Sequence, residues 1–307
     1  MIQIEEVGLR EGLQSNYICL SLEDKIRLID QLLDAGLDRV QLGSFVNEKR
    51  VPQMAGVDEL FKHYADNNDV LFSGLVLNQR GLERALESKV KLLNISISAS
   101  DEHNKENTGK SINEAMPTIL DMIKTARGEG VMVRAGIQAA FGCHFKGMPN
   151  IEIITEISQA YKDAGADEIG LSDTSGFATP GMIKNICNKV YDATDSLRLG
   201  IHLHDTFGMG MANVLAAIHS NVTVIDSSVA GMGGCPFMPD APGNLPTEDL
   251  LHMLHSLGYL KEIKLKEIID AATTARALFG KDFTGIVSKN YSLFNKLGLL
   301  EGLIDNK

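Results

Sequence analysis

Short apolar runs alternate with longer amphipathic segments along most of the chain. The apolar runs are rich in β-branched residues and almost continuous, which is typical of strands buried in a parallel sheet. Eight of them predict strands, at residues 3–7, 39–42, 70–75, 92–98, 131–139, 168–172, 199–203 and 222–227.

Each predicted strand is followed by a segment whose apolar residues recur every three or four positions, which indicates a helix with one buried face. In residues 22–35 the apolar positions include Ile26, Ile29 and Leu32, and Gly36 follows as a C-cap. The other helices of the series are predicted at residues 54–65, 81–88, 111–128, 151–164, 180–193, 209–220 and 246–257.

Eight strand–helix units predict an α/β fold in which the parallel sheet closes into a (β/α)8 TIM barrel. The alternative is an open, doubly wound sheet, but no Gly-x-Gly-x-x-Gly segment follows any of the predicted strands. We predict that residues 1–260 form the barrel domain and that residues 261–307 form a C-terminal helical extension packed on it.

The chain of 307 residues has a net charge of −11, with 29 Lys and Arg against 40 Asp and Glu. An acidic surface repels a phosphate backbone, so we expect no nucleic-acid partner. Mean hydropathy is −0.01, and no apolar run approaches the roughly 18 residues of a membrane-spanning helix. The four cysteines are too sparse for a disulfide framework. We therefore expect a cytoplasmic protein with no membrane partner.

Polar residues gather where the predicted strands end, which is where barrels of this kind place their active sites. The residues that fall there are Glu6, Arg10, Glu11, Gln41, Ser44, Ser96, Ser98, Ser100, Gln138, Ser172, Asp173, Thr174, His202, His204 and Asp205. A chain that needed only a stable barrel would not collect so many hydrogen-bonding groups at one end, so we predict a site there.

His202 and His204 give the sharpest local signal. Side chains at i and i+2 of a strand lie on the same face, so both imidazoles can share one metal. The alternative is one buried structural histidine and one surface histidine. Glu11 ends the first strand, close to the seventh and eighth in a closed barrel, and Asn244 ends a Gly-rich loop. Two nitrogens and two oxygens suit Mg²⁺ or Mn²⁺ better than structural Zn²⁺, which prefers thiolates.

Three further residues are candidates for catalysis. Arg10 precedes Glu11, and a guanidinium beside a metal can stabilise an enolate or bind a carboxylate; the alternative is a surface arginine. Cys235 lies in the Gly-rich loop, where a neighbouring cation would lower the pKa of its thiol from about 8.5 and allow proton transfer. Asp173 is a candidate to orient a ligand, or else it only contacts its own loop.

Several segments together resemble the 3-hydroxy-3-methylglutaryl-CoA lyase family of the DRE-TIM metallolyase superfamily, over about residues 2–300. They are VGLREGLQ (7–14), SFV (44–46), VPQM (51–54), SDTSG (172–176), HLHDTFG (202–208), GGCP (233–236) and GNLPTEDL (243–250). The histidine pair is shared by the superfamily, whereas the cysteine loop and the SFV segment are specific to the lyases.

The resemblance implies a metal-dependent TIM barrel that cleaves a 3-hydroxyacyl-CoA, such as 3-hydroxy-3-methylglutaryl-CoA, to acetoacetate and acetyl-CoA. Arg10 would stabilise the enolate of acetyl-CoA, Cys235 would transfer a proton, and Asp173 would assist near the hydroxyl. Such lyases are commonly dimers, so we expect an acyl-CoA substrate and a homodimer. The implied Mg²⁺ or Mn²⁺ ligands are Glu11, His202, His204 and Asn244.

The chain departs from the family pattern at the predicted barrel mouth. The family has Asp where this chain has Glu11. It has an acidic residue where this chain has Gln41, which is a fourth candidate for catalysis and whose amide keeps the hydrogen-bonding shape but loses the charge. A Gly-Cys-Pro segment reads Gly-Cys-His at 142–144. Two alternatives follow: a lyase or condensing enzyme for another hydroxyacyl-CoA of the citramalyl-CoA kind, and a homologue that binds metal or ligand without catalysis.

Overall fold

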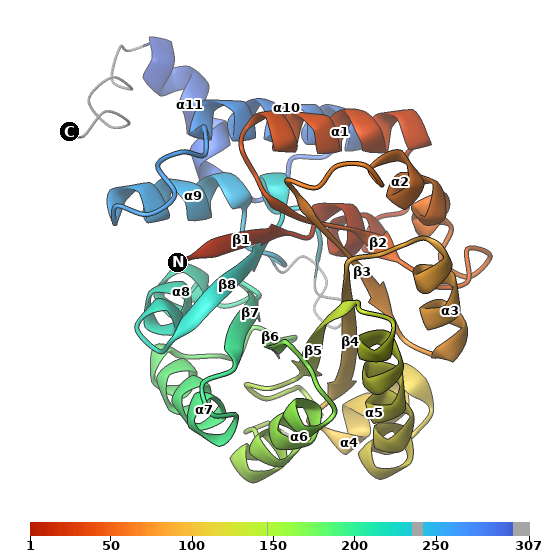
Figure 1. Cartoon of the computed structure of the whole chain (residues 1–307). Helices are drawn as coiled ribbons and strands as arrows, with labels where there is room; N and C mark the ends of the chain where they lie inside the picture. The colour runs from red at the N-terminus through yellow and green to blue at the C-terminus, as the bar shows by residue number, and fades with distance from the viewer. Residues whose placement is uncertain (146, 235–241, 297–307) are drawn as a thin grey trace.

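A computed structural model of the chain describes residues 1–145, 147–234 and 242–296, apart from the side chains of 292, 294 and 295. Eight parallel strands form a closed barrel in chain order (Figure 1). The first and last strands complete the ring by pairing from Gln3 opposite Val224 to Glu6 opposite Ser227. The closed ring confirms the predicted (β/α)8 fold, and the open doubly wound sheet was the wrong alternative.

The predicted strands and helices are all present, with ends that shift by at most three residues. The strands are β1 (Gln3–Glu6), β2 (Arg39–Ser44), β3 (Leu71–Val76), β4 (Leu92–Ser98), β5 (Met132–Gln138), β6 (Glu168–Asp173), β7 (Arg198–Leu203) and β8 (Val222–Ser227). The α-helices are α1 (Leu22–Asp34), α2 (Val57–His63), α3 (Gln79–Glu87), α4 (Asp101–Thr108), α5 (Ile112–Gly128), α6 (Ile151–Asp163), α7 (Pro180–Ala193), α8 (Gly210–Ile218), α9 (Thr247–Ser256), α10 (Leu265–Phe279) and α11 (Ile286–Lys296). None of these helices is long and apolar enough to cross a lipid bilayer.

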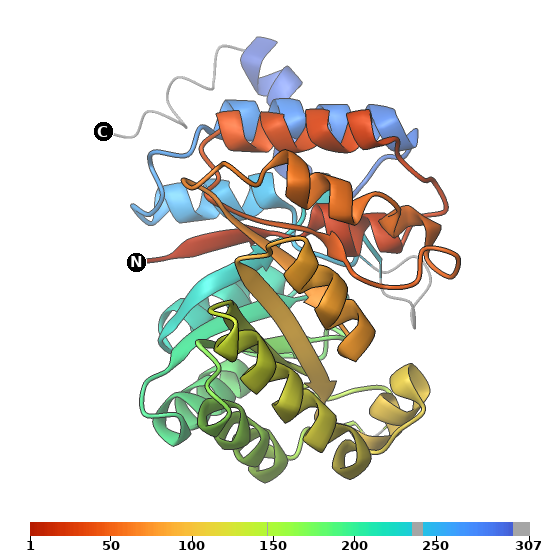
Figure 2. The ribbon, with the colours of Figure 1, turned by 45° about the vertical axis from the view of Figure 1, so that its right-hand side comes forward.

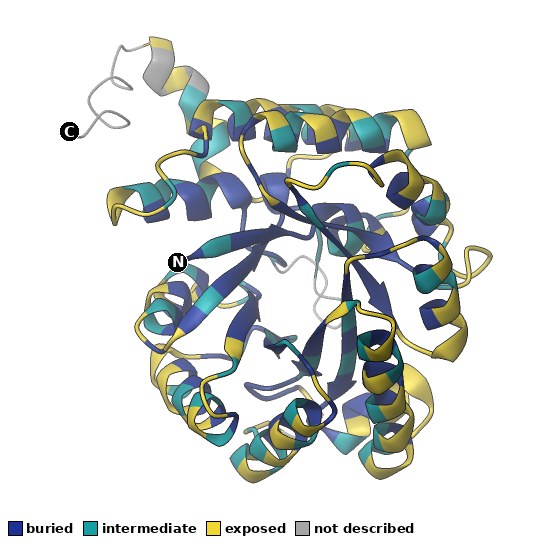
Figure 3. Ribbon diagram, viewed as in Figure 1, coloured by how far each residue is buried: buried dark blue, intermediate teal, exposed yellow. Residues whose placement is uncertain are grey.

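Local signals in the sequence fix where the helices begin. Helix α1 begins after Ser21, whose hydroxyl accepts a hydrogen bond from the Asp24 N–H. Helix α5 begins with a capping box in which Ser111 and Glu114 satisfy each other's backbone N–H groups. The helices bury their apolar sides against the strands and expose their outer sides (Figure 3). This arrangement leaves the loops at the carboxyl ends of the strands available for a site.

Helix α10 of the C-terminal segment packs against the first helix of the chain. Helix α10 lies alongside α1 in both views (Figures 1 and 2). The Lys264 N–H donates to the Ala35 carbonyl at the end of α1 over 2.8 Å, and the Gly285 N–H donates to the Ala230 carbonyl over 3.0 Å. The segment after residue 260 therefore contacts both α1 and the loop after β8. The division of the chain into two parts at residue 260 stays a prediction.

The inside of the barrel holds buried charges, which we call the interior ion network: Glu5, Arg39, Arg134, Glu168 and Asp226. Arg39 donates to both oxygens of Glu168 over 3.0 and 2.9 Å and to Glu5 over 2.9 Å. Arg134 donates to Glu5 over 2.7 Å and to Asp226 over 2.6 Å. These side chains come from five strands. Burying a charge without a partner costs free energy. Separating any of these five strands would leave such a charge, so the network helps to hold the strands together.

Replacing Arg39 with methionine is expected to lower the free energy of unfolding by about 3–5 kcal/mol, because it leaves Glu5 and Glu168 buried beside an apolar side chain. Urea unfolding measures this change. The matched control is Arg27→Met, because Arg27 pairs with Asp24 on the exposed side of α1, and surface pairs contribute at most about 1 kcal/mol. Equal effects of the two substitutions would contradict a supporting role for the network.

Candidate active site

Strand β1 leads into a short π-helix, η1 (Gly8–Gly12), which carries Arg10 and Glu11. A Cβ atom at Gly8 would come within 2.6 Å of a Glu6 carboxylate oxygen and 2.8 Å of the Met232 side chain, so only glycine fits there. π-Helical turns are rare and occur often at functional sites. The turn aims the Glu11 side chain at the end of β7.

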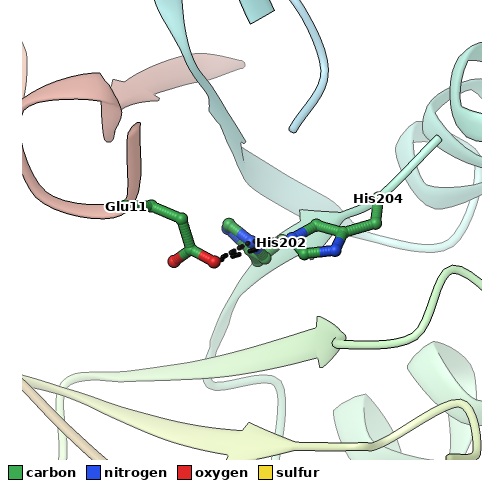
Figure 4. Close-up of side chains that lie close together, drawn as sticks. All are labelled: Glu11, His202 and His204. Carbon is green, nitrogen blue, oxygen red and sulfur yellow. Dashed lines mark hydrogen bonds and ion pairs between the residues drawn. The ribbon is translucent and has the colours of Figure 1, made fainter. Parts of the chain in front are cut away.

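Three of the predicted metal ligands lie together. The Nε2 atoms of His202 and His204 are 3.1 Å apart, and Glu11 Oε1 is 3.7 Å from the first and 3.6 Å from the second. Figure 4 shows the carboxylate directed at the two imidazoles. Both imidazoles are buried and lie on the same side of the chain, so the alternative of one buried and one surface histidine is wrong. Their ligand atoms lie within 4.8 Å of one another, close enough to share one metal ion.

Asn244 supplies a fourth donor beside these residues. Its backbone pairs with that of His204 across a β-bridge, and its side-chain Nδ2 donates to the Met232 carbonyl over 2.9 Å. Its Oδ1 is buried and has no hydrogen-bond partner among the residues that the structure describes. An unsatisfied buried polar atom costs about 1–3 kcal/mol, which a bound cation would offset. The donor set of two imidazoles, one carboxylate and one amide oxygen therefore fits a divalent metal.

The charges around Glu11 favour its ionised form. Burial acts to raise the pKa of this carboxyl group, but the Arg10 guanidinium and His202 outweigh it and hold the pKa well below its usual range. Burial acts in the opposite direction on His202, yet Glu11 and Asp226 raise the pKa of its imidazole. The carboxylate is thus available as an anionic ligand.

Arg10 is held from two sides. It forms an ion pair with Glu11, and its Nε donates to Gln41 Oε1 over 2.7 Å. Gln41 is buried in β2. Because an amide carries no charge, this contact orients the guanidinium and leaves its positive charge less compensated than a carboxylate would. The structure therefore brings Arg10, Glu11 and Gln41 together, as the sequence predicts.

Asp173, the last residue of β6, is fully buried. Its Oδ1 accepts a hydrogen bond from the Phe177 N–H over 2.9 Å, and its Oδ2 accepts one from the Ala178 N–H over 3.1 Å. Burial raises the pKa of Asp173 to about 6, although these bonds and His204 act to lower it. The loop contact that was the alternative for Asp173 is present, and a part in catalysis stays a prediction.

Glu6 has a role that the sequence did not reveal. Its Oε1 accepts hydrogen bonds from the Gly8 N–H over 2.8 Å and the Val229 N–H over 2.9 Å, and its Oε2 accepts one from the Thr247 hydroxyl over 2.6 Å. Burial raises the pKa of Glu6 to about 7. Glu6 therefore connects the π-helical turn, which contains Arg10, with the loop after β8. The sequence signal was a glutamate at the end of an apolar strand.

Cys235, the predicted proton-transfer residue, lies outside the described residues. The other three cysteines are free thiols: Cys19 is exposed, and Cys143 and Cys187 are buried. Burial raises the pKa of the Cys187 thiol to about 12, so this thiol stays protonated. The role of Cys235 stays a prediction.

The closed barrel and the four donors at the carboxyl ends of its strands define an enzyme of the (β/α)8 class with a candidate metal centre. A model of the HMGL-like family matches residues 1–275. The chain belongs to this family and is a hydroxymethylglutaryl-CoA lyase-like enzyme, so the resemblance seen in the sequence is confirmed.

Individual relatives match almost the whole chain. The chain is 35% identical over 280 residues to the 3-hydroxy-3-isohexenylglutaryl-CoA/hydroxymethylglutaryl-CoA lyase of Pseudomonas aeruginosa, covering 91% of this chain and 93% of the relative. It is 34% identical over 298 residues to the (R)-citramalyl-CoA lyase of Chloroflexus aurantiacus, covering 94% of each. The structure of an HMG-CoA lyase from Acinetobacter baumannii in complex with coenzyme A and 3-methylmalate matches with a TM-score of 0.88 and 32% identity, covering 94% of each chain.

Proposed function

We propose that the protein is a divalent-metal-dependent carbon–carbon lyase that cleaves 3-hydroxy-3-methylglutaryl-CoA, or a close analogue, to acetoacetate and acetyl-CoA. The observation that carries the proposal is the convergence of Glu11, His202 and His204 close to Asn244, whose Oδ1 has no partner within the described part of the chain, with the Arg10 guanidinium next to Glu11. The relatives act on CoA thioesters of hydroxy acids, which agrees with this site.

The metal would be held by Glu11, His202, His204 and Asn244. The mixed nitrogen and oxygen donors, without a thiolate, favour Mg²⁺ or Mn²⁺ over structural Zn²⁺. When bound, the ion supplies Lewis-acid polarisation of the substrate hydroxyl and carboxylate oxygens. Arg10 and His202 together favour the ionised form of Glu11, which is the form that binds a cation.

The cleavage needs no redox partner. The C3 hydroxyl gives up a proton, the C2–C3 bond breaks, C3 becomes the ketone of the keto acid, and the electron pair stays on the thioester as an enolate. Arg10, oriented by Gln41, would donate hydrogen bonds to the enolate oxygen. Asp173, with a pKa of about 6, suits a group near the hydroxyl that accepts a proton at neutral pH. Cys235 would return a proton to C2.

The nucleotide end of CoA would lie over the loops after β2 and β3. A cavity of about 670 Å³ opens there, and its lining includes Lys49, Arg50, Arg80 and Arg84. Arg84 also pairs with Asp58, which fixes one wall. Basic side chains suit the phosphate groups of CoA, and these loops lie at the same end of the barrel as the candidate metal centre.

A second candidate is a lyase for a different hydroxyacyl-CoA. Glu11 and Gln41 favour it, because the longer carboxylate and the neutral amide alter the space and the charge where the acyl group would lie. The similarity to the (R)-citramalyl-CoA lyase also supports it. The homodimer and the cytoplasmic location stay predictions.

The proposal is tested by a coupled assay of acetyl-CoA release from 3-hydroxy-3-methylglutaryl-CoA. With Mg²⁺ or Mn²⁺ we expect turnover on the order of 1–1000 per second, abolished by EDTA. Turnover that EDTA leaves unchanged would contradict the metal centre. No turnover in metal-loaded protein would favour the second candidate, and citramalyl-CoA in the same assay would then decide between the substrates.

A further inference from the structure

The imidazole of His202 is held between two different environments. Its Nε2 faces His204 at 3.1 Å and Glu11 at 3.7 Å, on the side of the candidate metal centre. Its Nδ1 lies 3.2 Å from Asp226 Oδ2, on the side of the barrel interior. The two ring nitrogens therefore face in opposite directions, one toward the proposed ligand set and one toward the interior ion network.

Asp226 connects the histidine to a buried arginine. The residue lies on β8, next to β7, and its other oxygen accepts a hydrogen bond from Arg134 Nη1 over 2.6 Å. Arg134 also pairs with Glu5 over 2.7 Å and with Glu168 over 3.2 Å. The guanidinium thus holds one carboxylate oxygen of Asp226, and the other oxygen is placed to accept a hydrogen bond from a neighbouring imidazole N–H.

Two glycines make room for this arginine. A Cβ atom at Gly170 would come within 2.8 Å of Arg134 Nε, and one at Gly200 would come within 2.6 Å of Arg134 Nη2. These glycines belong to β6 and β7, and the Arg134 side chain lies directly against both. The guanidinium is therefore confined on several sides, and so is the carboxylate that it holds.

We infer that Asp226 is a positioning residue for the metal centre: held by Arg134, it keeps the proton of His202 on Nδ1 and presents Nε2 to the metal. A neutral imidazole has one donor nitrogen and one acceptor nitrogen, so a donor bond from Nδ1 leaves the lone pair on Nε2. A carboxylate that does not bind the metal itself, but accepts a hydrogen bond from a metal-binding histidine, raises the affinity of the site for its metal. The inference rests on the proposed metal centre.

The first test measures Mn²⁺ binding by isothermal titration calorimetry to metal-stripped protein. The Asp226→Asn variant keeps the size of the side chain and removes its charge, and we expect a dissociation constant about 10–100-fold higher than that of the parent. Glu168→Gln is the matched control. Glu168 belongs to the same network and pairs with the same arginine. Its hydrogen bonds and ion pairs within the described part of the chain do not include His202 or His204. Its Mn²⁺ affinity should stay within about twofold of the parent.

The second test can be read in the parent protein alone, and the variant extends it. In ¹⁵N-histidine-labelled, metal-free parent protein at alkaline pH, NMR should show His202 protonated at Nδ1, and the Asp226→Asn variant should lose that preference. Protonation of His202 at Nε2 in the parent would overturn the inference. So would unchanged Mn²⁺ affinity in Asp226→Asn, or an equal loss in both variants, because either result assigns Asp226 a structural role alone. A parent that binds no Mn²⁺ would instead refute the proposed metal centre, and the NMR result would still decide the role of Asp226.

Discussion

Replacing His204 with alanine is expected to remove the metal and the activity together. The imidazole supplies one of the donors that lie within 4.8 Å of one another, and its backbone pairs with Asn244, so it joins two parts of the proposed ligand set. The loss of Mn²⁺ affinity should exceed the roughly 10–100-fold effect that is typical of outer partners of a metal site. Metal content after dialysis and acetyl-CoA release measure the two losses.

The control for this substitution is His219→Ala, which removes an exposed histidine at the end of α8. It should bind Mn²⁺ and turn over like the parent. A His204→Ala protein that keeps its metal but loses turnover would place this histidine in the chemistry and not in the ligand set, and the four-residue site would need revision.

Replacing Arg10 with methionine is expected to lower kcat by about 10²–10³-fold while Mn²⁺ remains bound. The guanidinium is the positive group that the structure aims across the candidate site, held by Gln41 and paired with Glu11. Loss of one donor aimed at a developing oxyanion typically costs about 2.7–4 kcal/mol of transition-state stabilisation. Steady-state kinetics together with metal analysis separate this effect from loss of the ion.

The Arg10→Lys variant refines the test, because lysine keeps the charge but lacks the planar pair of donors. It should recover part of the lost rate. Parent-like kcat in Arg10→Met would show that enolate stabilisation does not depend on Arg10. A loss of Mn²⁺ as large as the loss of rate would instead mean that this residue acts through the ionisation of Glu11.

The barrel could be predicted because its strands and helices have strong periodic patterns. The prediction that Glu11 lies near the histidine pair depended only on closure of the barrel, which places the first strand next to the last. Helix α4 was missed for a physical reason: its sequence, DEHNKENT, is polar throughout, so it has no apolar period. Its signal was Ser100, which caps it by accepting a hydrogen bond from the His103 N–H, followed by two acidic residues in the first turn. The π-helix after β1 depends on close packing against Met232, which lies far away in the sequence.

The candidate site could be predicted in composition but not in its supports. Charged residues such as Arg39, Arg134 and Asp226 lie within strand sequences, which indicates a polar interior. The sequence around each of them does not show which residue it pairs with. The position of Asn244 beside His204 and the hydrogen bonds of Glu6 also depend on contacts between distant loops. Strand patterns therefore identify which residues reach the mouth, and only the folded chain shows what holds them there.

The interior ion network also sets a limit on how this enzyme can be engineered for heat resistance. Exchanging buried ions for well-packed apolar side chains often makes a protein more stable, by about 1–4 kcal/mol. Here the same exchange at Arg134 would take away the cation that holds Asp226 beside His202. An apolar exchange at Arg134 would thus weaken the site that we propose for the metal, so stabilising changes belong away from this arginine, on the outer helices.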